Sequence, residues 1–237
     1  MSLDALRLAA AALTLALIAG CDREGFGGPP RSGPQLTDVQ ASPTSVAADD
    51  VSLIRVSATI PDTSGVQPAQ VVFSSTAGIF TASSGSSAIV PADDSGHALA
   101  YLRAPRQPTS AVLTVGAGGT IVVDTVGFTP AFPDDVALDP SRFVIVSGDS
   151  NEIVITAFLQ RVAGLVSPGR MVRFSATTGR FGAASVSDDS GIVRVRYTAG
   201  VVAESTAVTI TGATQRNNPT ATDTTSVVGQ TTVTVLP

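Results

Sequence analysis

The sequence contains no lysine and no tryptophan, and it has only one histidine, one cysteine and two tyrosines. Without lysine there is no Schiff-base or lysine general-base chemistry, and without tryptophan there are few flat surfaces for sugar stacking. His97 follows the turn residue Gly96, and no Gly-x-Ser-x-Gly elbow accompanies it, so we expect it to face solvent. We predict a protein that is not an enzyme, with no catalytic residue, no cofactor and no metal.

Charge is also scarce. Charged residues make up 14% of the chain and hydrophobic residues 43%, a balance that excludes a disordered tail. Residues 36–132 hold seven acids and three arginines, and residues 133–237 hold nine acids and eight arginines. Neither half has the basic surplus of a nucleic-acid binder, so we expect no nucleic-acid partner.

Cys21 closes the run Leu17-Ile18-Ala19-Gly20-Cys21 near the start of the chain. Arg7 precedes an apolar stretch over residues 8–20, which is shorter than the ~20 residues of a spanning helix. This layout resembles the lipobox of bacterial lipoproteins, in which a signal peptide is removed before a cysteine that carries lipid. The resemblance implies a signal peptide over residues 1–20 and lipidation of Cys21.

A segment rich in glycine and proline follows Cys21 up to residue 35, and we expect it to be a flexible tether between the lipid and the folded part. The lipid would place the chain at the bacterial cell envelope, either at the outer membrane or the cell surface or, alternatively, at the periplasmic face of a membrane. Cys21 is the only cysteine, so we expect no disulfide, and the fold has to be stabilised by its core.

Residues 71–80, VVFSSTAGIF, and residues 172–181, VRFSATTGRF, are two copies of one pattern at an offset of 101. The run Asp-Asp-Ser-Gly also occurs twice, at 93–96 and 188–191. A period of about 100 residues is the size of one β-sandwich domain.

Apolar and polar residues alternate within each copy, as in strands with one buried face. In the first copy the apolar positions include Ile54, Val56 and Ala58, and in the second they include Val193 and Val195. We predict an all-β fold of two tandem immunoglobulin-like β-sandwiches, at 36–131 and 132–237.

The order of these motifs resembles the bacterial immunoglobulin-like domains of the invasin and intimin family. The matching runs are GVQPAQVVFSSTAG with DDSGHALAYL, and GLVSPGRMVRFSATTG with DDSGIVRVRY. Those families carry a membrane β-barrel before such domains and a lectin-like tip after them. We expect a lipid in place of the barrel. We also expect residues 231–236 to form the last strand of the second sandwich, with no tip domain after it, so the receptor binding of those adhesins is not carried over.

Three groups of side chains are candidate sites. Paired aspartates at 93–94 and 188–189 are expected to cap turns, and Asp134-Asp135, with Asp62 or Asp139, could bind calcium at the domain junction or could simply be solvated. Phe128 and Phe132 are expected to pack the two sandwiches together. The third group consists of arginines of the second domain, which either recognise an acidic partner from a shared face or line an exposed strand face: Arg170, Arg173, Arg180, Arg194 and Arg196.

We therefore predict a membrane-anchored, non-enzymatic lipoprotein that acts as a spacer, an adhesion module or a protein-interaction module of the cell envelope. Its partners would be the membrane, through Cys21, and a protein or cell-surface component. The alternative is a self-assembling subunit of a surface layer or filament, whose strand edges pair between copies. A carbohydrate-binding module is less favoured because aromatic side chains are few.

Overall fold

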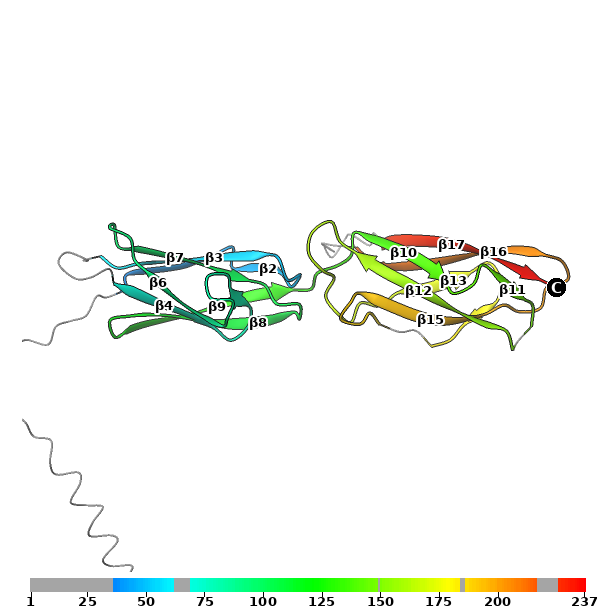
Figure 1. Cartoon of the computed structure of the whole chain (residues 1–237), viewed down its shortest axis with the longest axis horizontal. Coiled ribbons are helices and arrows are strands. Elements are labelled where there is room, and N and C mark those ends of the chain that lie inside the picture. Colours follow the sequence, from blue (N-terminus) through cyan, green and yellow to red (C-terminus); the bar gives the residue numbers. More distant parts are fainter. Residues whose placement is uncertain (1–35, 62–68, 149, 184–185, 217–225) are drawn as a thin grey trace, which may run out of the picture. The chain divides into compact units, whose positions relative to one another are not determined.

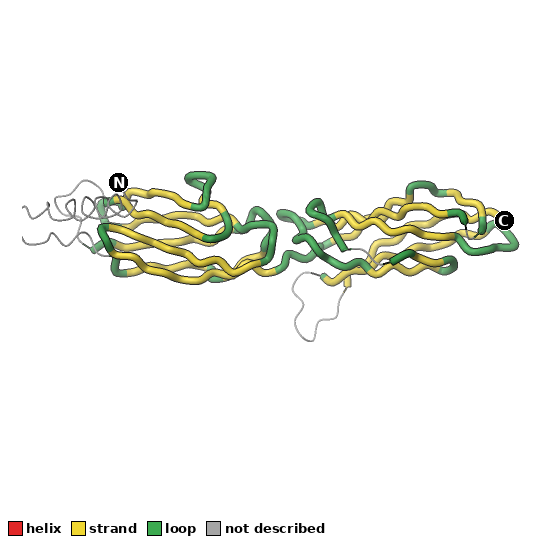
Figure 2. The backbone as a smooth tube through the Cα atoms, turned by 90° about the horizontal axis from the view of Figure 1, so that it is seen from below, coloured by secondary structure: helices red, strands yellow, loops and turns green. Residues whose placement is uncertain are grey.

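A computed structural model describes residues 36–61, 69–148, 150–183, 186–216 and 226–237. In these residues the chain forms strands joined by turns and loops, with no helix (Figure 2). The strands form four sheets, two in each half of the sequence. The predicted all-β fold of two tandem sandwiches is confirmed.

The first sandwich, coloured blue to green in Figure 1, is built from one sheet of four strands and one of five. The four-stranded sheet has the order β1 (Asp38–Ser42), β3 (Leu53–Thr59), β7 (His97–Arg103), β5 (Ile79–Phe80). The five-stranded sheet has the order β2 (Ser45–Ala47), β9 (Thr120–Thr129), β8 (Thr109–Ala117), β4 (Gln70–Ser75), β6 (Ser87–Pro91). All pairs are antiparallel except β2 with β9.

The second sandwich repeats this plan with two sheets of four strands. One sheet has the order β10 (Asp135–Pro140), β12 (Glu152–Gln160), β15 (Ile192–Thr198), β14 (Arg180–Phe181). The other has the order β11 (Val144–Val146), β17 (Ser226–Leu236), β16 (Thr206–Gln215), β13 (Arg173–Ala176). β11 pairs parallel to β17, as β2 does to β9. β9 ends at Thr129 and β10 begins at Asp135, and the domain boundary after residue 131 stays a prediction.

The cores lie between the paired sheets, where the alternating apolar side chains meet. Ile54, Val56 and Ala58 are fully buried, and Arg55 between them is exposed, as the alternation predicts. Two of the largest side chains of the first core, Phe73 and Phe80, have ring centroids 6.2 Å apart. Burying one such side chain contributes about 1.5–3 kcal/mol, and the described residues contain no cysteine to add a disulfide.

Two equivalent turns connect the sheets at the Asp-Asp-Ser-Gly runs. In the first, Gly96 donates its N–H to the carbonyl of Asp93 at 2.8 Å and has φ +79°. In the second, Gly191 donates to Asp188 at 3.0 Å and has φ +74°. Glycine adopts this left-handed backbone without steric cost, so both turns require it.

The two glycines differ in the space around them, which gives a matched pair of variants. Gly96→Ala places a Cβ against the carbonyl oxygen of Ile60, whereas Gly191→Ala places it 3.1 Å from the carbonyl oxygen of Leu159. Both variants lose about 1 kcal/mol because of the left-handed backbone. We expect Gly96→Ala to lose clearly more, measured by urea unfolding, and equal losses would contradict the close packing of Gly96 on Ile60.

Candidate functional site at the junction of the two sandwiches

Asp49 lies just after β2 and turns the chain at the end of the first sandwich. Its Oδ1 accepts the N–H groups of Val51 at 3.1 Å and Ser52 at 2.7 Å, and its Oδ2 accepts the Ser52 hydroxyl at 2.8 Å. The backbone carbonyl of Asp49 accepts the N–H of Leu165 from the second sandwich, at 2.8 Å. This turn therefore caps one domain and binds the next.

Arg161 follows β12 and reaches the same turn from the second sandwich. Its Nη1 donates to the carbonyl of Phe132 at 2.7 Å, its Nε to the carbonyl of Ala163 at 3.0 Å, and its Nη2 to Asp49 at 3.4 Å. Only 8% of the Arg161 side chain and 3% of the Asp49 side chain are exposed. Burying two charges is unfavourable unless each finds such partners, so removing one partner is strongly destabilising.

Ser167 is fully buried and links three segments at once. Its hydroxyl donates to the carbonyl of Ala48 at 2.8 Å and accepts the N–H of Ala131 at 2.9 Å, while its own N–H donates to the carbonyl of Ala131 at 3.0 Å. The hydroxyl thus satisfies backbone groups at the end of the first sandwich that would otherwise be buried without partners.

Gly164 allows the loop after β12 to approach Asp49 closely. It has φ +73°, and a Cβ at this position would lie 2.6 Å from the carbonyl oxygen of Asp49 and 2.7 Å from a methyl of Val51. A side chain would push the loop away from the turn. These contacts join both sandwiches within one unit, Gly33–Pro237.

Two further arginines line the junction. The Arg170 guanidinium lies 5.0 Å from the centre of the Phe132 ring, a cation–π distance, and burial lowers the pKa of Arg170. Among the described residues, Nε of Arg170 and Nε and Nη2 of Arg106 are buried without a hydrogen-bond partner. We expected Phe128 and Phe132 to join the sandwiches, but only Phe132 contacts the second, because Phe128 is buried in the first core.

The predicted capping role is confirmed at both turns for the first aspartate of each pair, Asp93 and Asp188. Asp93 accepts the N–H groups of Ser95 and His97, each at 2.9 Å. The bond from His97 is the main reason why the pKa of Asp93 lies below its ordinary value, and the bond from Ser95 and the His97 charge act in the same direction. His97 itself is exposed, as predicted, and its Nδ1 lies 3.1 Å from the Thr59 hydroxyl.

Asp188 caps the equivalent turn of the second sandwich. It accepts the N–H groups of Ser190 at 2.8 Å and Ile192 at 3.0 Å. The bond from Ile192 is the largest cause of its lowered pKa, followed by the bond from Ser190 and the charges of Arg194 and Arg106.

The hypothesis that Arg173 shares a face with Arg194 and Arg196 is wrong. Arg173 lies on β13, and the other two lie on β15 in the opposite sheet. The alternating β15 arginines are exposed, and Arg196 pairs with Glu152 on β12 at 3.1 Å. Arg180, on β14, lies in the same sheet as β15. These contacts fit the interpretation of an exposed strand face with alternating charge.

The structure describes no cluster of three or more potential metal ligands in the parts of the chain that it covers. At the junction, Asp134 accepts the N–H of Val162 at 2.9 Å, so one of its oxygens stabilises a turn. Asp62, one of the two additional ligands considered for calcium, lies outside the described residues. Cys21 and the tether also lie outside them, so lipidation stays a prediction, and no described segment is a helix that could span a bilayer.

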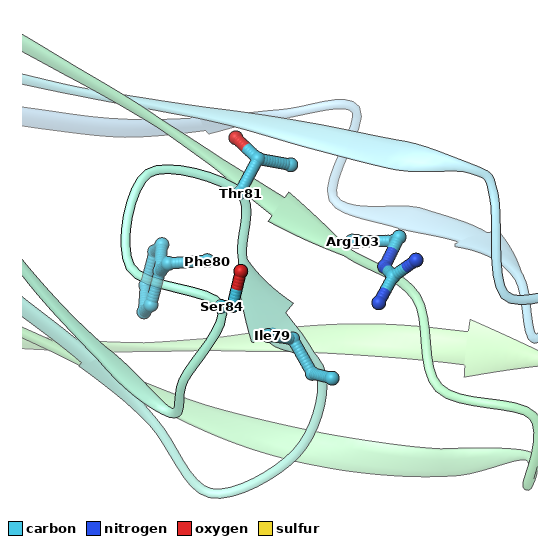
Figure 3. Close-up of a pocket in the computed structure, with 5 residues that line it drawn as sticks. All are labelled: Ile79, Phe80, Thr81, Ser84 and Arg103. Atoms are coloured by element: carbon cyan, nitrogen blue, oxygen red, sulfur yellow. The ribbon is translucent and has the colours of Figure 1, made fainter.

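A small hollow of about 200 Å³ lies beside β5 in the first sandwich, lined by Ile79, Phe80, Thr81, Ser84 and Arg103 (Figure 3). Arg103 is the only titratable residue of these five, and it lies 3.9 Å from Asp50, with both side chains well exposed. Convergent polar groups, which an active site needs, are missing from this lining.

Sequence reasoning missed Arg161 and Ser167. A signal for Arg161 was present in the repeat itself. Leu159 and Ile60 are equivalent, because each donates its N–H to the turn glycine of its own copy, Gly191 or Gly96. Two residues after them, Arg161 of the second copy corresponds to Asp62 of the first. The two copies therefore carry opposite charge at this position, which distinguishes Arg161 from the residues that both copies share.

Comparison with known proteins yields structural matches only. No protein-family model and no curated protein sequence matches the chain. The solved structure of invasin, a bacterial integrin-binding protein, matches with a TM-score of 0.61 and 19% identity, over 85% of this chain and 39% of invasin. The adhesin InvE of Yersinia pseudotuberculosis matches with a TM-score of 0.50 and 18% identity, over 88% of this chain and 61% of InvE.

The resemblance to invasin-type immunoglobulin-like domains is therefore confirmed at the level of the fold. The chain spans less than two thirds of either matched structure, and at this identity the likeness does not extend to what those proteins bind.

The junction network predicts a large difference between two arginine variants. Arg161→Ala leaves Asp49 buried without its cation, so we expect a loss of about 3 kcal/mol in the free energy of unfolding. The matched control, Arg196→Ala, removes an exposed ion pair with Glu152 and should cost less than about 1 kcal/mol. Urea unfolding of both variants measures this, and similar losses would show that the junction pair is not the buried, coupled contact described above.

Proposed function

We propose that this protein is a non-enzymatic lipoprotein of the bacterial cell envelope, held by lipid on Cys21, that acts as a spacer and as an adhesion or protein-interaction module. The observation that carries the proposal is the buried network of Asp49, Arg161 and Ser167. A module that presents a binding surface away from a membrane needs a joint that resists bending, and this network satisfies the polar groups of the joint from both sides.

Three features support the non-enzymatic part of the proposal. The repeated turn aspartates are engaged by backbone amides, the single histidine is exposed on a strand, and the hollow beside β5 lacks convergent titratable groups. The shared fold with invasin and InvE also supports an adhesion or interaction role at the cell surface.

The anchor is tested by mass analysis of the mature N-terminus after expression in a bacterium. We expect the chain to begin at Cys21 with the added mass of acyl chains and to partition with membranes. Cys21→Ser should abolish the added mass and release the protein from membranes, since no other residue in the chain can form the thioether. Asp22→Ala is the matched control and should keep the lipid. An unmodified Cys21, or cleavage elsewhere, contradicts the anchor.

A second candidate is the self-assembling subunit, for which the sequence predicts pairing of strand edges. An apolar row on the outer face of the five-stranded sheet of the first sandwich favours association through a sheet face instead of an edge. Val72 pairs with Ile89 on β6 and with Gly116 on β8, and Gly116 pairs with Ile121 on β9. Ile89 and Ile121 are 63% and 67% exposed, which is unusual for isoleucine on a sheet face.

If this row joins copies, the purified protein should associate as its concentration rises in sedimentation velocity. The double variant Ile89→Thr with Ile121→Thr should stay monomeric, because threonine keeps strand propensity while removing apolar surface. Wild-type protein that is monomeric from the micromolar to the millimolar range contradicts self-assembly.

A further inference from the structure

The two sandwiches are copies of one plan, but one strand of the first has no counterpart among the residues of the second that the structure describes. In the first sandwich, β4 pairs with β8 on one side and with β6 on the other. In the second, the equivalent strand β13 pairs with β16 and is the last strand of its sheet within the described residues. The single bridge between Met171 and Val186 corresponds to the first rung of the β4–β6 ladder, Gln70 with Pro91.

The length of the segment that leads to the turn aspartate explains the difference between the two sandwiches. Twelve residues, 81–92, separate Phe80 from the turn aspartate of the first copy, and only six, 182–187, separate Phe181 from that of the second. At about 3.3 Å per residue, six residues can cross between the sheets but cannot also run along β13. The crossing is visible at its two ends, where Gly182 donates its N–H to Arg196 and Ser187 donates to Arg170.

The backbone of β13 presents hydrogen-bonding groups at this edge. Thr177 donates its N–H to Thr209 near the end of β16, so every second residue before it also bonds to β16. The residues in between, Phe174 and Ala176, direct their N–H and C=O groups away from β16. In β4 the equivalent groups bond to β6, where Ser75 donates to Ser86 at 2.9 Å.

The missing strand also opens the core. Phe73 and Phe80 are fully buried in the first sandwich, where Ala88 of β6 lies opposite Phe73 and is itself buried. Their counterparts Phe174 and Phe181, with ring centroids 5.7 Å apart, are only half-buried. The sheet edge lies beside these partly exposed rings, so one extended strand would complete both the ladder and the cover of the core.

The β4–β6 pairing specifies the strand that fits. The position of Ala88 faces inward onto a phenylalanine, and the position of Ile89 lies opposite Val72 on the outer face. In the second sandwich Arg173 takes the place of Val72 and is exposed. The fitting strand therefore has a small apolar side chain facing the rings and a carboxylate beside Arg173.

We propose that the free edge of β13 is a docking site for an extended, antiparallel segment of a partner protein, with a small apolar residue facing Phe174 and an acidic residue facing Arg173. The site deepens the role as a protein-interaction module, on which it rests, by naming the surface and the chemistry of the partner. Main-chain bonds supply affinity in such strand addition, and alternate side chains supply specificity.

Synthetic peptides test the site, because β6 itself is the template. A peptide of residues 84–90, SGSSAIV, which stops before the positions that Val186 and Ser187 already fill beside Met171 and Arg170, should bind the full-length protein in calorimetry. The same peptide with Ile89→Glu should bind about threefold more tightly, from one exposed ion pair with Arg173. With Ala88→Asp it should not bind, since a carboxylate would face the phenylalanine rings.

Variants of the protein locate the binding. Ala176→Pro removes an N–H that faces the edge and should weaken the peptide about tenfold, whereas the neighbouring Ser175→Ala changes only an outward side chain and should bind as wild type. A graft that replaces residues 182–186 by residues 81–91 supplies the missing strand within the chain. It should fold with a higher unfolding midpoint and no longer bind the peptide.

Hydrogen exchange gives a residue-level readout, in which the amides of Phe174 and Ala176 should exchange more slowly when the peptide is bound. Failure of wild-type protein to bind the peptides, equal binding by the graft, or binding of the Ala88→Asp peptide overturns the site. None of these outcomes depends on Cys21, so failure of the site and failure of the lipid anchor are told apart by separate measurements.

Discussion

The structure depends on the pairing of each strand with its neighbours while its alternate side chains are buried against a second sheet. With no disulfide among the described residues, the two apolar cores and their ladders supply the stability of the fold. A strand that lacks a neighbour therefore loses backbone bonds and core cover together. The first sandwich shows the complete arrangement around Phe73, and the second shows it without one strand around Phe174.

At the junction of the two sandwiches, buried backbone groups are satisfied by side chains instead of by a neighbouring strand. Where the first sandwich ends, the carbonyls of Ala48 and Phe132 and the N–H of Ala131 have no ladder to join, and the second sandwich satisfies them through Ser167 and Arg161. These bonds involve charged and polar groups at low exposure, so the joint is specific to this pair of surfaces. The tandem arrangement is thus fixed by hydrogen bonding as well as by the short connection.

The sequence was sufficient to predict the strands, the repeat and the capped turns, because each of these has a local pattern. Ile54 and Val56 alternate with polar residues, and an Asp-Asp-Ser-Gly run occurs once in each copy. The junction was not predicted, because Asp49 and Arg161 are 112 residues apart and no local pattern pairs one with the other. The prediction that the arginines share one face was wrong for a related reason. Their exposure was predicted correctly, but which of them are neighbours depends on the assignment of strands to sheets, which the sequence alone does not give.

The two partners of the Asp49–Arg161 contact come from different copies of the repeat, and neither copy has both residues. The position equivalent to Arg161 in the first sandwich is Asp62. Ser147 donates its N–H to Leu236 as Ala48 does to Thr129, so the position equivalent to Asp49 in the second sandwich is Gly148. Gly148 has no carboxylate to replace that of Asp49, and Asp62 has no guanidinium to replace that of Arg161. A tandem of two first sandwiches would lack Arg161, and a tandem of two second sandwiches would lack Asp49, so the two copies are complementary at the joint and are not interchangeable.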